Sequence, residues 1–328
     1  MPDFNLTNTD VVTFHHDNLR FWLNRGVDGF RFDAVDNLVE NGPAAWEKQP
    51  QNYVLMKDVR TLLDGYAKRY MVCEAPADST GLGASTACGS AFAFGHQSDI
   101  VNAAKGSTSA VKAVADYFIS APSTVATMVS NHDSFAGQRL FDQVGGNLAQ
   151  YKLAAATYLL QPGTPFIYYG EEIGMSGAAS LSGDPKLRTP MSWTAGGGFT
   201  TGTPFRASSG NVATYNVAAQ SADPNSLLAW YKGLIALRRA HPSLARGSYE
   251  AASASGSVMS FQRVLGAEHT VVVVNYGASA AAVSLVSLPA NAMLTAVMPT
   301  GASSVNADAS GNAVVNVPAQ SVVVYTAS

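Results

Sequence analysis

Helical patterns alternate with short apolar runs along the chain up to about residue 240. Between residues 8 and 26, Phe14, His15, Leu19, Trp22 and Leu23 recur at helical spacing, which predicts a helix that Asn8 or Thr9 caps and Gly26 ends. Brief apolar runs at 27–34, 70–74, 90–94, 125–131 and 165–169 each precede a helical stretch or a polar loop. This rhythm predicts five strands of a parallel sheet built from β/α units.

Two later segments of this region have patterns of their own. Residues 171–222 are rich in Gly, Ser, Thr and Pro, which predicts a long ordered loop. Asp223-Pro224 predicts the start of the last helix, and Pro242 its end. The buried stripe of that helix is expected to be Leu227, Leu228, Tyr231, Leu234 and Ile235.

The pattern changes after Gly247. Alternating apolar residues at 258–264, 270–276, 293–298, 313–317 and 321–326, with Gly, Asn and Ser turns between them, predict antiparallel strands. We therefore expect two domains, a β/α domain at residues 1–245 and a C-terminal β-sandwich at 246–328.

Charge narrows the classes of partner. The 328 residues have a net charge of -3 and 13% charged side chains, so no basic field is present to bind nucleic acid or an acidic membrane surface. Apolar runs such as 271–274 are far shorter than the ~20 residues of a membrane span. We expect a neutral substrate, no nucleic-acid partner and no membrane segment.

Two cysteines, Cys73 and Cys88, are too few for a disulfide framework and lack the spacing of a metal site. Buried free thiols are the favoured interpretation, and a single bridge is the alternative.

Three acids follow different predicted strands: Asp33, Glu74 and Asp133. Alone, each has an ordinary explanation as a helix cap, an ion-pair partner or a turn residue. Together they are expected to converge, because the carboxyl ends of strands in a parallel β/α barrel meet at one cleft.

The neighbours of these acids differ. Arg31 is two residues before Asp33, on the same face of a strand, where its cation would keep the carboxylate ionised and oriented. Glu74 follows Met71-Val72-Cys73, a partly apolar setting that favours a carboxyl group with a proton to give.

At these residues the chain resembles the α-amylase family of glycoside hydrolases, with six motifs in the family's order. Residues 29–34 (GFRFDA) resemble the nucleophile motif, 73–75 (CEA) the acid/base motif, and 130–133 (SNHD) the motif of the transition-state stabiliser. Further similarity lies in residues 1–5 (MPDFN), near the end of the family's inserted domain, in 163–172 (GTPFIYYGEE), its last barrel strand, and in 184–193 (DPKLRTPMSW), a loop of its α-glucosidase-like members.

The resemblance implies retaining hydrolysis of α-1,4-glucosidic bonds in starch and maltooligosaccharides, as by an α-amylase. Asp33 would be the nucleophile, Glu74 the acid/base and Asp133 the transition-state stabiliser, with carboxyl groups of Asp33 and Glu74 ~5–5.5 Å apart. Substrate contacts are expected from Arg31, His132, Asn37, Arg188 and Tyr169. Two alternatives stay open: an exo-acting α-glucosidase or glucosyltransferase of the same family, and a non-catalytic remnant that binds maltooligosaccharides.

The resemblance begins after the family's third barrel strand. It therefore implies an incomplete (β/α)8 TIM barrel, strands four to eight, followed by the sandwich. Either the chain is a fragment, or a homo-oligomer completes the barrel. No cofactor is expected: calcium is possible in this family, but its usual ligands are mostly absent, and Asp36-Asn37 replace a more common Lys-His. The substrate and low charge favour an extracellular or periplasmic location, although the first residues lack a secretory signal pattern.

Overall fold

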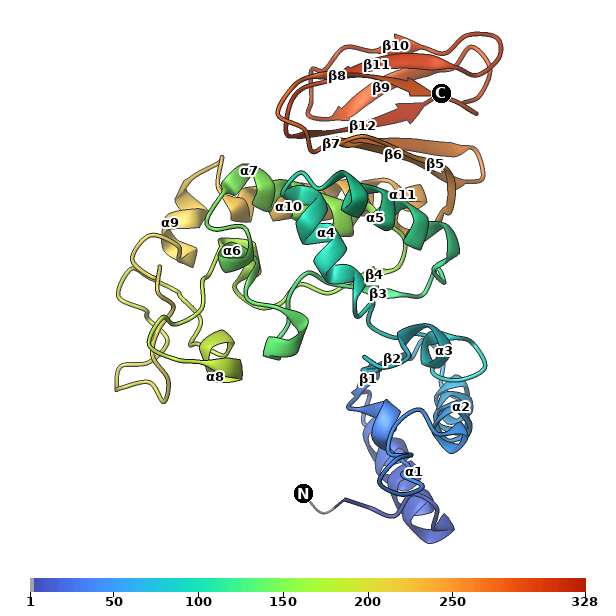
Figure 1. Ribbon diagram of the computed structural model, residues 1–328, viewed down its shortest axis with the longest axis vertical. Coiled ribbons are helices and arrows are strands. Elements are labelled where there is room, and N and C mark those ends of the chain that lie inside the picture. The colour runs from blue at the N-terminus through green and yellow to red at the C-terminus, as the bar shows by residue number, and fades with distance from the viewer. Residues whose placement is uncertain (1–2) are drawn as a thin grey trace. The chain divides into compact units, whose positions relative to one another are not determined.

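The computed structural model describes residues 3–328, and these form two compact units. The first unit ends at Phe94 and also includes Thr124–Ala126. The second consists of Gly95–Ser123 and Thr127–Ser328. In Figure 1 the chain runs from blue helices and strands in the first unit to red strands at the C-terminal end of the second.

The first unit has a parallel strand pair covered by helices. Its elements are α1 (Thr9–Leu23), β1 (Gly29–Phe32), the short 3-10 helix η1 (Val35–Asn37), α2 (Pro50–Asp64), β2 (Tyr70–Cys73) and α3 (Ser79–Gly83). β1 and β2 are parallel, with Gly29 opposite Tyr70 and Phe32 opposite Cys73. A Cβ atom on Gly29 would collide with the carbonyl oxygen of Tyr70, so this glycine permits the close approach of the two strands.

Helix α1 confirms one part of its prediction and corrects another. The Asn8 side chain caps the helix by accepting a hydrogen bond from the Asp10 N–H group. Of the predicted apolar stripe, Leu23 is buried, but Phe14 and Trp22 are 56% and 52% exposed. The core of this unit takes only Leu19 and Leu23 from that stripe, so helical spacing found the helix but not its buried face.

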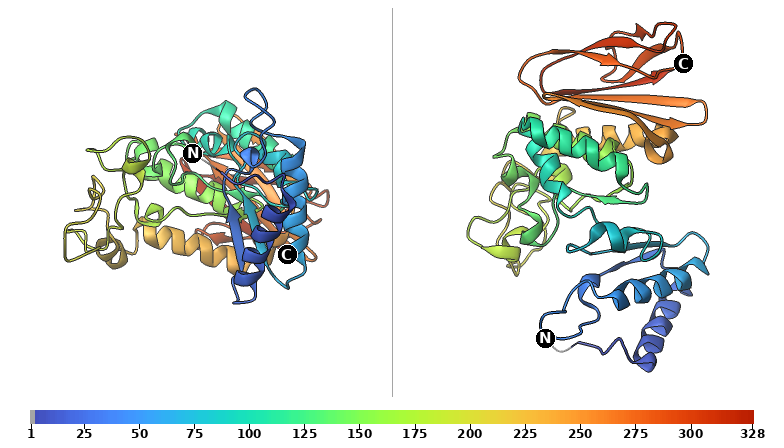
Figure 2. Two further views of the ribbon diagram at one scale, coloured as in Figure 1. Left: turned by 90° about the horizontal axis from the view of Figure 1, so that it is seen from below. Right: turned by 45° about the vertical axis from the view of Figure 1, so that its right-hand side comes forward.

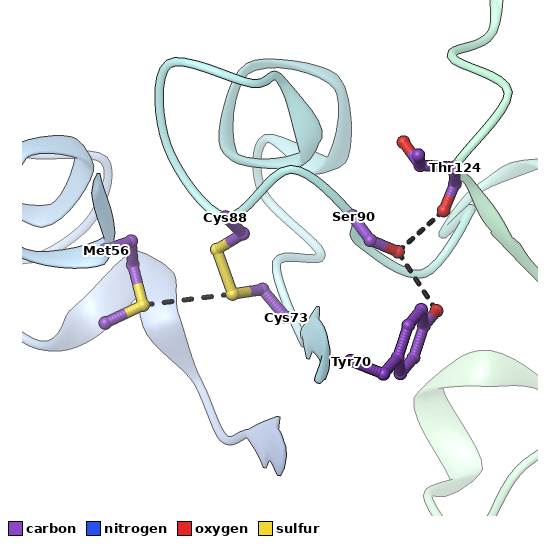
Figure 3. Close-up of a disulfide and its surroundings, with 6 residues drawn as sticks. All are labelled: Met56, Tyr70, Cys73, Cys88, Ser90 and Thr124. Atoms are coloured by element: carbon purple, nitrogen blue, oxygen red, sulfur yellow. Dashed lines mark hydrogen bonds between the residues drawn. A yellow bond between two sulfur atoms is a disulfide. The ribbon is translucent and has the colours of Figure 1, made fainter. Parts of the chain in front are cut away.

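The strands predicted at 90–94, 125–131 and 165–169 are shorter than expected. Backbone hydrogen bonds join Phe92 N to the Cys73 carbonyl and Ala93 N to the Ala126 carbonyl, yet only isolated bridges form at 90–94. β3 is Ala126–Thr127, and it pairs with β4, Thr164–Pro165. Hydrogen bonds from the Ser90 hydroxyl to the Thr124 carbonyl and with the Tyr70 hydroxyl accompany this irregular pairing (Figure 3).

The prediction of free thiols is wrong. Cys73, the last residue of β2, forms a disulfide with Cys88, and Met56 of α2 places its Sδ atom 3.8 Å from Cys73 Sγ (Figure 3). After α3 the chain turns back toward β2. In this turn the Cys88 N–H group donates to the Leu82 carbonyl. Both cysteines are fully buried, as expected, but they form the single bridge that was the alternative interpretation.

The helices of the second unit come before its C-terminal strands in the chain. They are α4 (His96–Ala104), α5 (Thr108–Ser120), η2 (Ser134–Ala136), α6 (Leu140–Gln143), α7 (Leu148–Leu160), η3 (Glu171–Ile173), α8 (Gly183–Leu187), α9 (Val217–Ala222), α10 (Leu227–Ala240) and α11 (Pro242–Arg246). Contacts join α5 to β5, α11 to β6 and α7 to β12 (Figure 2). No helix within residues 3–328 is long and apolar enough to cross a bilayer.

The last helix does not begin at Asp223-Pro224. Ser226 caps α10, since its hydroxyl accepts from the Ala229 N–H group, and residues 223–225 form the turn after α9. Ile235 of the predicted stripe is 38% exposed. Pro242 opens α11 rather than ending α10. The predicted loop at 171–222 contains η3, α8 and α9, with no regular helix or strand between 188 and 216.

The C-terminal strands are antiparallel, and they form two layers in the right-hand view of Figure 2. A six-stranded sheet has the order β10-β9-β12-β7-β6-β5, and a second pair is β11-β8. The strands predicted from the sequence are β6 (Val258–Leu265), β7 (Glu268–Asn275), β9 (Met293–Met298), β11 (Ala313–Val317) and β12 (Ser321–Ala327). Three more were not predicted, β5 (Ser248–Ser255), β8 (Ala281–Leu285) and β10 (Val305–Asn306). β5 is rich in Ala and Ser, so it lacks the usual β-branched signal.

Candidate active site

Asp33 and Glu74 are brought together by the strand pair of the first unit. Because Phe32 is opposite Cys73 in the parallel register, the next residue on each strand is one of the two acids. Backbone hydrogen bonds continue the pairing past the strand ends, from Glu74 N to the Phe32 carbonyl (2.9 Å) and from Val35 N to the Glu74 carbonyl (3.0 Å). The two acids therefore follow adjacent strands at the same edge.

One arginine contacts both carboxylates. Arg31 Nη1 donates to Asp33 Oδ1, as the two-residue spacing predicts, and Arg31 Nη2 is 3.3 Å from Glu74 Oε2. The sequence had suggested separate surroundings for the two acids. The structure instead gives them a shared guanidinium group, whose planar fork suits two acceptors at once.

The two carboxyl groups differ in their exposure to solvent. The Asp33 side chain is 80% exposed, whereas the Glu74 side chain is 8% exposed. Ala34, directly after Asp33, has a left-handed backbone (φ 44°), and its N–H group donates to Glu74 Oε2 at 2.7 Å. The backbone next to Asp33 thus orients the carboxyl group of Glu74.

A cavity of about 620 Å³ lies beside Asp33 within the same unit. Its walls are mainly apolar residues of α1, α2 and β1, among them Leu19, Phe32, Leu55 and Met56. Asn37 also lines this cavity, and its Nδ2 group donates to the Trp46 carbonyl at 3.2 Å. The cavity gives Asp33 open space on one side.

Asp133 belongs to the second unit, together with His132 and Arg188. Asp133 Oδ1 is 2.6 Å from Arg188 Nη2, and Asp133 Oδ2 is 3.1 Å from His132 Nε2. Arg188 also donates from Nε to the His132 carbonyl. Three residues of the predicted site, from two separate motifs, are therefore in direct contact.

Asp184, a residue that the sequence did not single out, completes this cluster. Its Oδ1 atom accepts from both the N–H group and the hydroxyl of Ser134 at 2.8 Å, and its Oδ2 atom accepts from Arg188. These hydrogen bonds to Ser134 are the main reason why the pKa of Asp184 is lowered. Asp184 opens the 184–193 motif, so the motif itself was a signal for it.

Tyr169 lies farther along the second unit. Its hydroxyl donates to the Thr189 carbonyl, and its own carbonyl accepts from Arg139 Nη1 at 2.8 Å. Arg139 is almost fully buried and lies 4.7 Å from the ring centroids of Tyr168 and Tyr169. The sequence around residue 139 did not predict these contacts, because the partners of the Arg139 side chain are distant in sequence.

Within residues 3–328, no three His, Cys, Asp or Glu side chains are close enough together to hold a metal ion. The expectation that the protein works without calcium remains a prediction, since calcium is also bound by carbonyl oxygens. Of the 1–5 motif, residues 1 and 2 lie outside the described residues.

The fold is that of α-amylase-type barrel proteins with a C-terminal antiparallel sheet. A crystal structure of an α-amylase from H. orenii superposes on 100% of this chain and 66% of its own, with a TM-score of 0.78 and 24% identity. The α-glucosyl transfer enzyme XgtA gives the same TM-score at 23% identity, over 100% of this chain and 69% of its own. At these identities the likeness establishes the fold.

Sequence comparison establishes the family. Residues 1–247 match the family described as alpha amylase, catalytic domain. The trehalose synthase/amylase TreS of Mycolicibacterium smegmatis is 30% identical over 315 residues, which cover 80% of this chain and 53% of that protein. A probable α-glucosidase of Rhizobium meliloti is 29% identical over 332 residues, 85% of this chain and 60% of its own length. The chain therefore belongs to the α-amylase family of glycoside hydrolases, and it spans a little over half the length of these relatives.

Proposed function

We propose that this protein hydrolyses α-1,4-glucosidic bonds of maltooligosaccharides and starch with retention of configuration. Glu74 protonates the glycosidic oxygen while Asp33 attacks the anomeric carbon, so that the bond to the leaving sugar breaks as a covalent glucosyl-enzyme forms. Glu74 then removes a proton from water, which attacks the same carbon and releases Asp33.

The observation that carries this proposal is the shared contact of Arg31 with Asp33 and Glu74 at the ends of adjacent parallel strands. The exposed Asp33 carboxylate beside a cavity suits attack on a sugar. The buried Glu74 carboxyl, oriented by the Ala34 N–H group, suits proton transfer at a fixed position. Asp133 is proposed, from its motif and its contact with His132, to stabilise the oxocarbenium-like transition state.

A trapping experiment tests the proposal directly. The full chain is incubated with 5-fluoro-α-D-glucosyl fluoride, and the labelled residue is located by peptide mass spectrometry. We expect one glucosyl adduct, on Asp33. Asp33→Asn should prevent labelling, and Glu74→Gln should lower turnover of a nitrophenyl maltooligosaccharide by roughly 10³-fold or more. Asp17→Asn, an exposed aspartate of α1, is the matched control.

The second candidate within the family is an exo-acting α-glucosidase or a glucosyltransferase. It is favoured by the relatives, which include a probable α-glucosidase and trehalose synthases. Product analysis on maltoheptaose separates the two. Mixed short oligomers at early times support endo hydrolysis, glucose alone supports the α-glucosidase, and longer or rearranged sugars support transfer.

The candidate from another class is a non-catalytic maltooligosaccharide-binding protein. An unlabelled Asp33 and a wild-type turnover no higher than that of Asp33→Asn would contradict hydrolysis. Binding of maltoheptaose under those conditions, measured by calorimetry, would then support the binding protein.

We further propose an oxidising location, outside the cell or in the periplasm, and assembly of two or more copies through the free edge of β1. The Cys73–Cys88 disulfide supports the location, because such bridges persist mainly in oxidising compartments. Among residues 3–328, β1 pairs with β2 alone, which leaves one edge for another strand. A monomeric mass in light scattering at micromolar concentration would contradict the assembly.

A further inference from the structure

Asp36 is a buried acid three residues after Asp33, in the short helix η1. It is 1% exposed, although aspartate is rarely fully buried without a partner. Its Oδ2 atom accepts from the backbone N–H group of Ala77 at 2.8 Å, across 41 residues of sequence. Ala77 lies three residues after Glu74. The carboxyl group of Asp36 therefore links the loop after Asp33 to the loop after Glu74.

The backbone of Asp36 is also fixed. Its carbonyl accepts from the buried Asn52 side chain of α2 and from the Lys48 N–H group. Asn52 in turn accepts from the Val39 N–H group at 2.8 Å. Helix α2 thus fixes the position of η1. The hydrogen bond between Asp36 and Ala77 extends this constraint to the loop after Glu74.

We propose that Asp36 is a positioning residue that sets the distance between the nucleophile Asp33 and the acid/base Glu74. This inference rests on the proposed function. Asp36 contacts neither carboxylate, but the loops that it joins carry both. The hydrogen bonds that cross between these loops include Ala34 N–H to Glu74 Oε2, Val35 N–H to the Glu74 carbonyl and Ala77 N–H to Asp36 Oδ2, and the last of these supports the first.

The position needs a hydrogen-bond acceptor rather than a charge. Burial is the main cause that raises the pKa of Asp36, while the hydrogen bond from the Ala77 backbone lowers it and the charge of Asp78 raises it. Within residues 3–328, Oδ1 of Asp36 is buried without a hydrogen-bond partner. One oxygen facing Ala77 is therefore enough, and an asparagine can supply it.

Two variants separate these properties in the full-length chain. Asp36→Asn keeps the acceptor, so kcat and KM on a nitrophenyl maltooligosaccharide should stay within about 3-fold of the wild type. Asp36→Ala removes the acceptor, and kcat should fall about 10- to 100-fold with little change in KM, because a shift of about 1 Å between reacting groups costs as much as 10²-fold. Asp36→Val, similar in size to aspartate, is the second variant if alanine impairs folding.

Leu63→Val is the matched control for simple destabilisation. Leu63 is fully buried on α2 in the same unit, and its truncation removes none of the atoms that form hydrogen bonds between the two loops. At an equal loss of Tm, it should leave kcat unchanged. An equal loss of kcat in Leu63→Val, or in Asp36→Asn, would overturn the proposal.

A second measurement does not depend on catalysis. Hydrogen exchange of the Ala34 amide, observed by NMR with alanine-selective ¹⁵N labelling, reports the bond from Ala34 to Glu74. Exchange should be at least about 10-fold faster in Asp36→Ala and unchanged in Asp36→Asn. Unchanged exchange in Asp36→Ala would refute the positioning role. If the wild type resists labelling at Asp33, the proposed function fails, and this exchange rate still decides whether Asp36 sets the geometry.

Discussion

Each of the two units has one arginine that contacts two acids. In the first unit Arg31 contacts Asp33 and Glu74, and in the second Arg188 contacts Asp133 and Asp184. The two clusters differ in where their acids face. The Asp33 side chain is 80% exposed, whereas that of Asp133 is 16% exposed. The same kind of ion pair therefore involves an exposed carboxylate in the first unit and a mostly buried one in the second.

The clusters also differ in how the sequence encodes them. Arg31 is on β1 and Asp33 directly follows it, two residues away, so the alternation of side chains along the extended backbone places them together. Arg188 and Asp133 are 55 residues apart and meet through a long loop. The first contact is local and the second depends on the folded unit.

Replacing each arginine should produce the largest contrast between the clusters. Arg31→Ala removes the cation beside both proposed catalytic carboxylates, and we expect kcat/KM for a nitrophenyl maltooligosaccharide to fall by roughly 10²- to 10³-fold. Arg188→Ala should cost roughly 10-fold, because His132 still contacts Asp133 and Ser134 still holds Asp184. Steady-state kinetics at matched folded fraction measures both effects.

Arg20→Ala is the control for loss of a surface arginine, since Arg20 pairs only with the exposed Asp17 among residues 3–328. It should leave kcat/KM unchanged. Equal losses in Arg31→Ala and Arg188→Ala would break the comparison, because the shared contact of Arg31 would then carry no special role.

The local contacts explain which parts of the fold and site were predictable. The helix after Asn8, the strand pair and the order of the acids all follow from short-range patterns, and the structure has them. The start of α10 at Ser226, the exposure of Phe14 and the partners of Arg139 depend on tertiary packing, which no local pattern contains. The disulfide was missed because two cysteines 15 residues apart do not reveal the turn that joins them.

The disulfide is a second difference between the two units. It lies in the first unit, and one of its cysteines directly precedes Glu74. Cys73→Ala with Cys88→Ala opens a loop of 15 residues, which should reduce the free energy of unfolding by about 3 kcal/mol. Hydrogen exchange should become faster in β1 and β2 but not in β7 of the second unit. Urea unfolding and exchange mass spectrometry measure the two effects. Faster exchange in both units alike would show that the bridge does not act locally.

The second unit has a buried acid in place of the bridge. Glu171 is 2% exposed and accepts hydrogen bonds from Tyr158, Tyr231 and Ser130, the last of which is the first residue of the 130–133 motif. Burial raises the pKa of Glu171 to about 7, against the opposing effect of these hydroxyl groups. Three neutral hydroxyl donors therefore stabilise the charged carboxylate less than water does, whereas a guanidinium group can compensate for the lost hydration.

This raised pKa predicts how the stability of the second unit depends on pH. Below pH 4.5, the ordinary pKa of this carboxyl group, Glu171 is protonated in both the folded and the unfolded chain. Between pH 4.5 and about 7 only the folded chain keeps the proton, so its stability falls as pH rises and levels off above pH 7. The loss should be about 3 kcal/mol. Glu171→Gln, which cannot ionise, should flatten this part of the pH profile and be more stable than the wild type at pH 8.

Urea unfolding at pH 5 and pH 8 measures the difference, with the exposed Glu250→Gln of the same unit as control. If Glu171→Gln keeps the pH slope of the wild type, the buried carboxyl group does not control the stability of this unit, and its contrast with the arginine-bound acids fails.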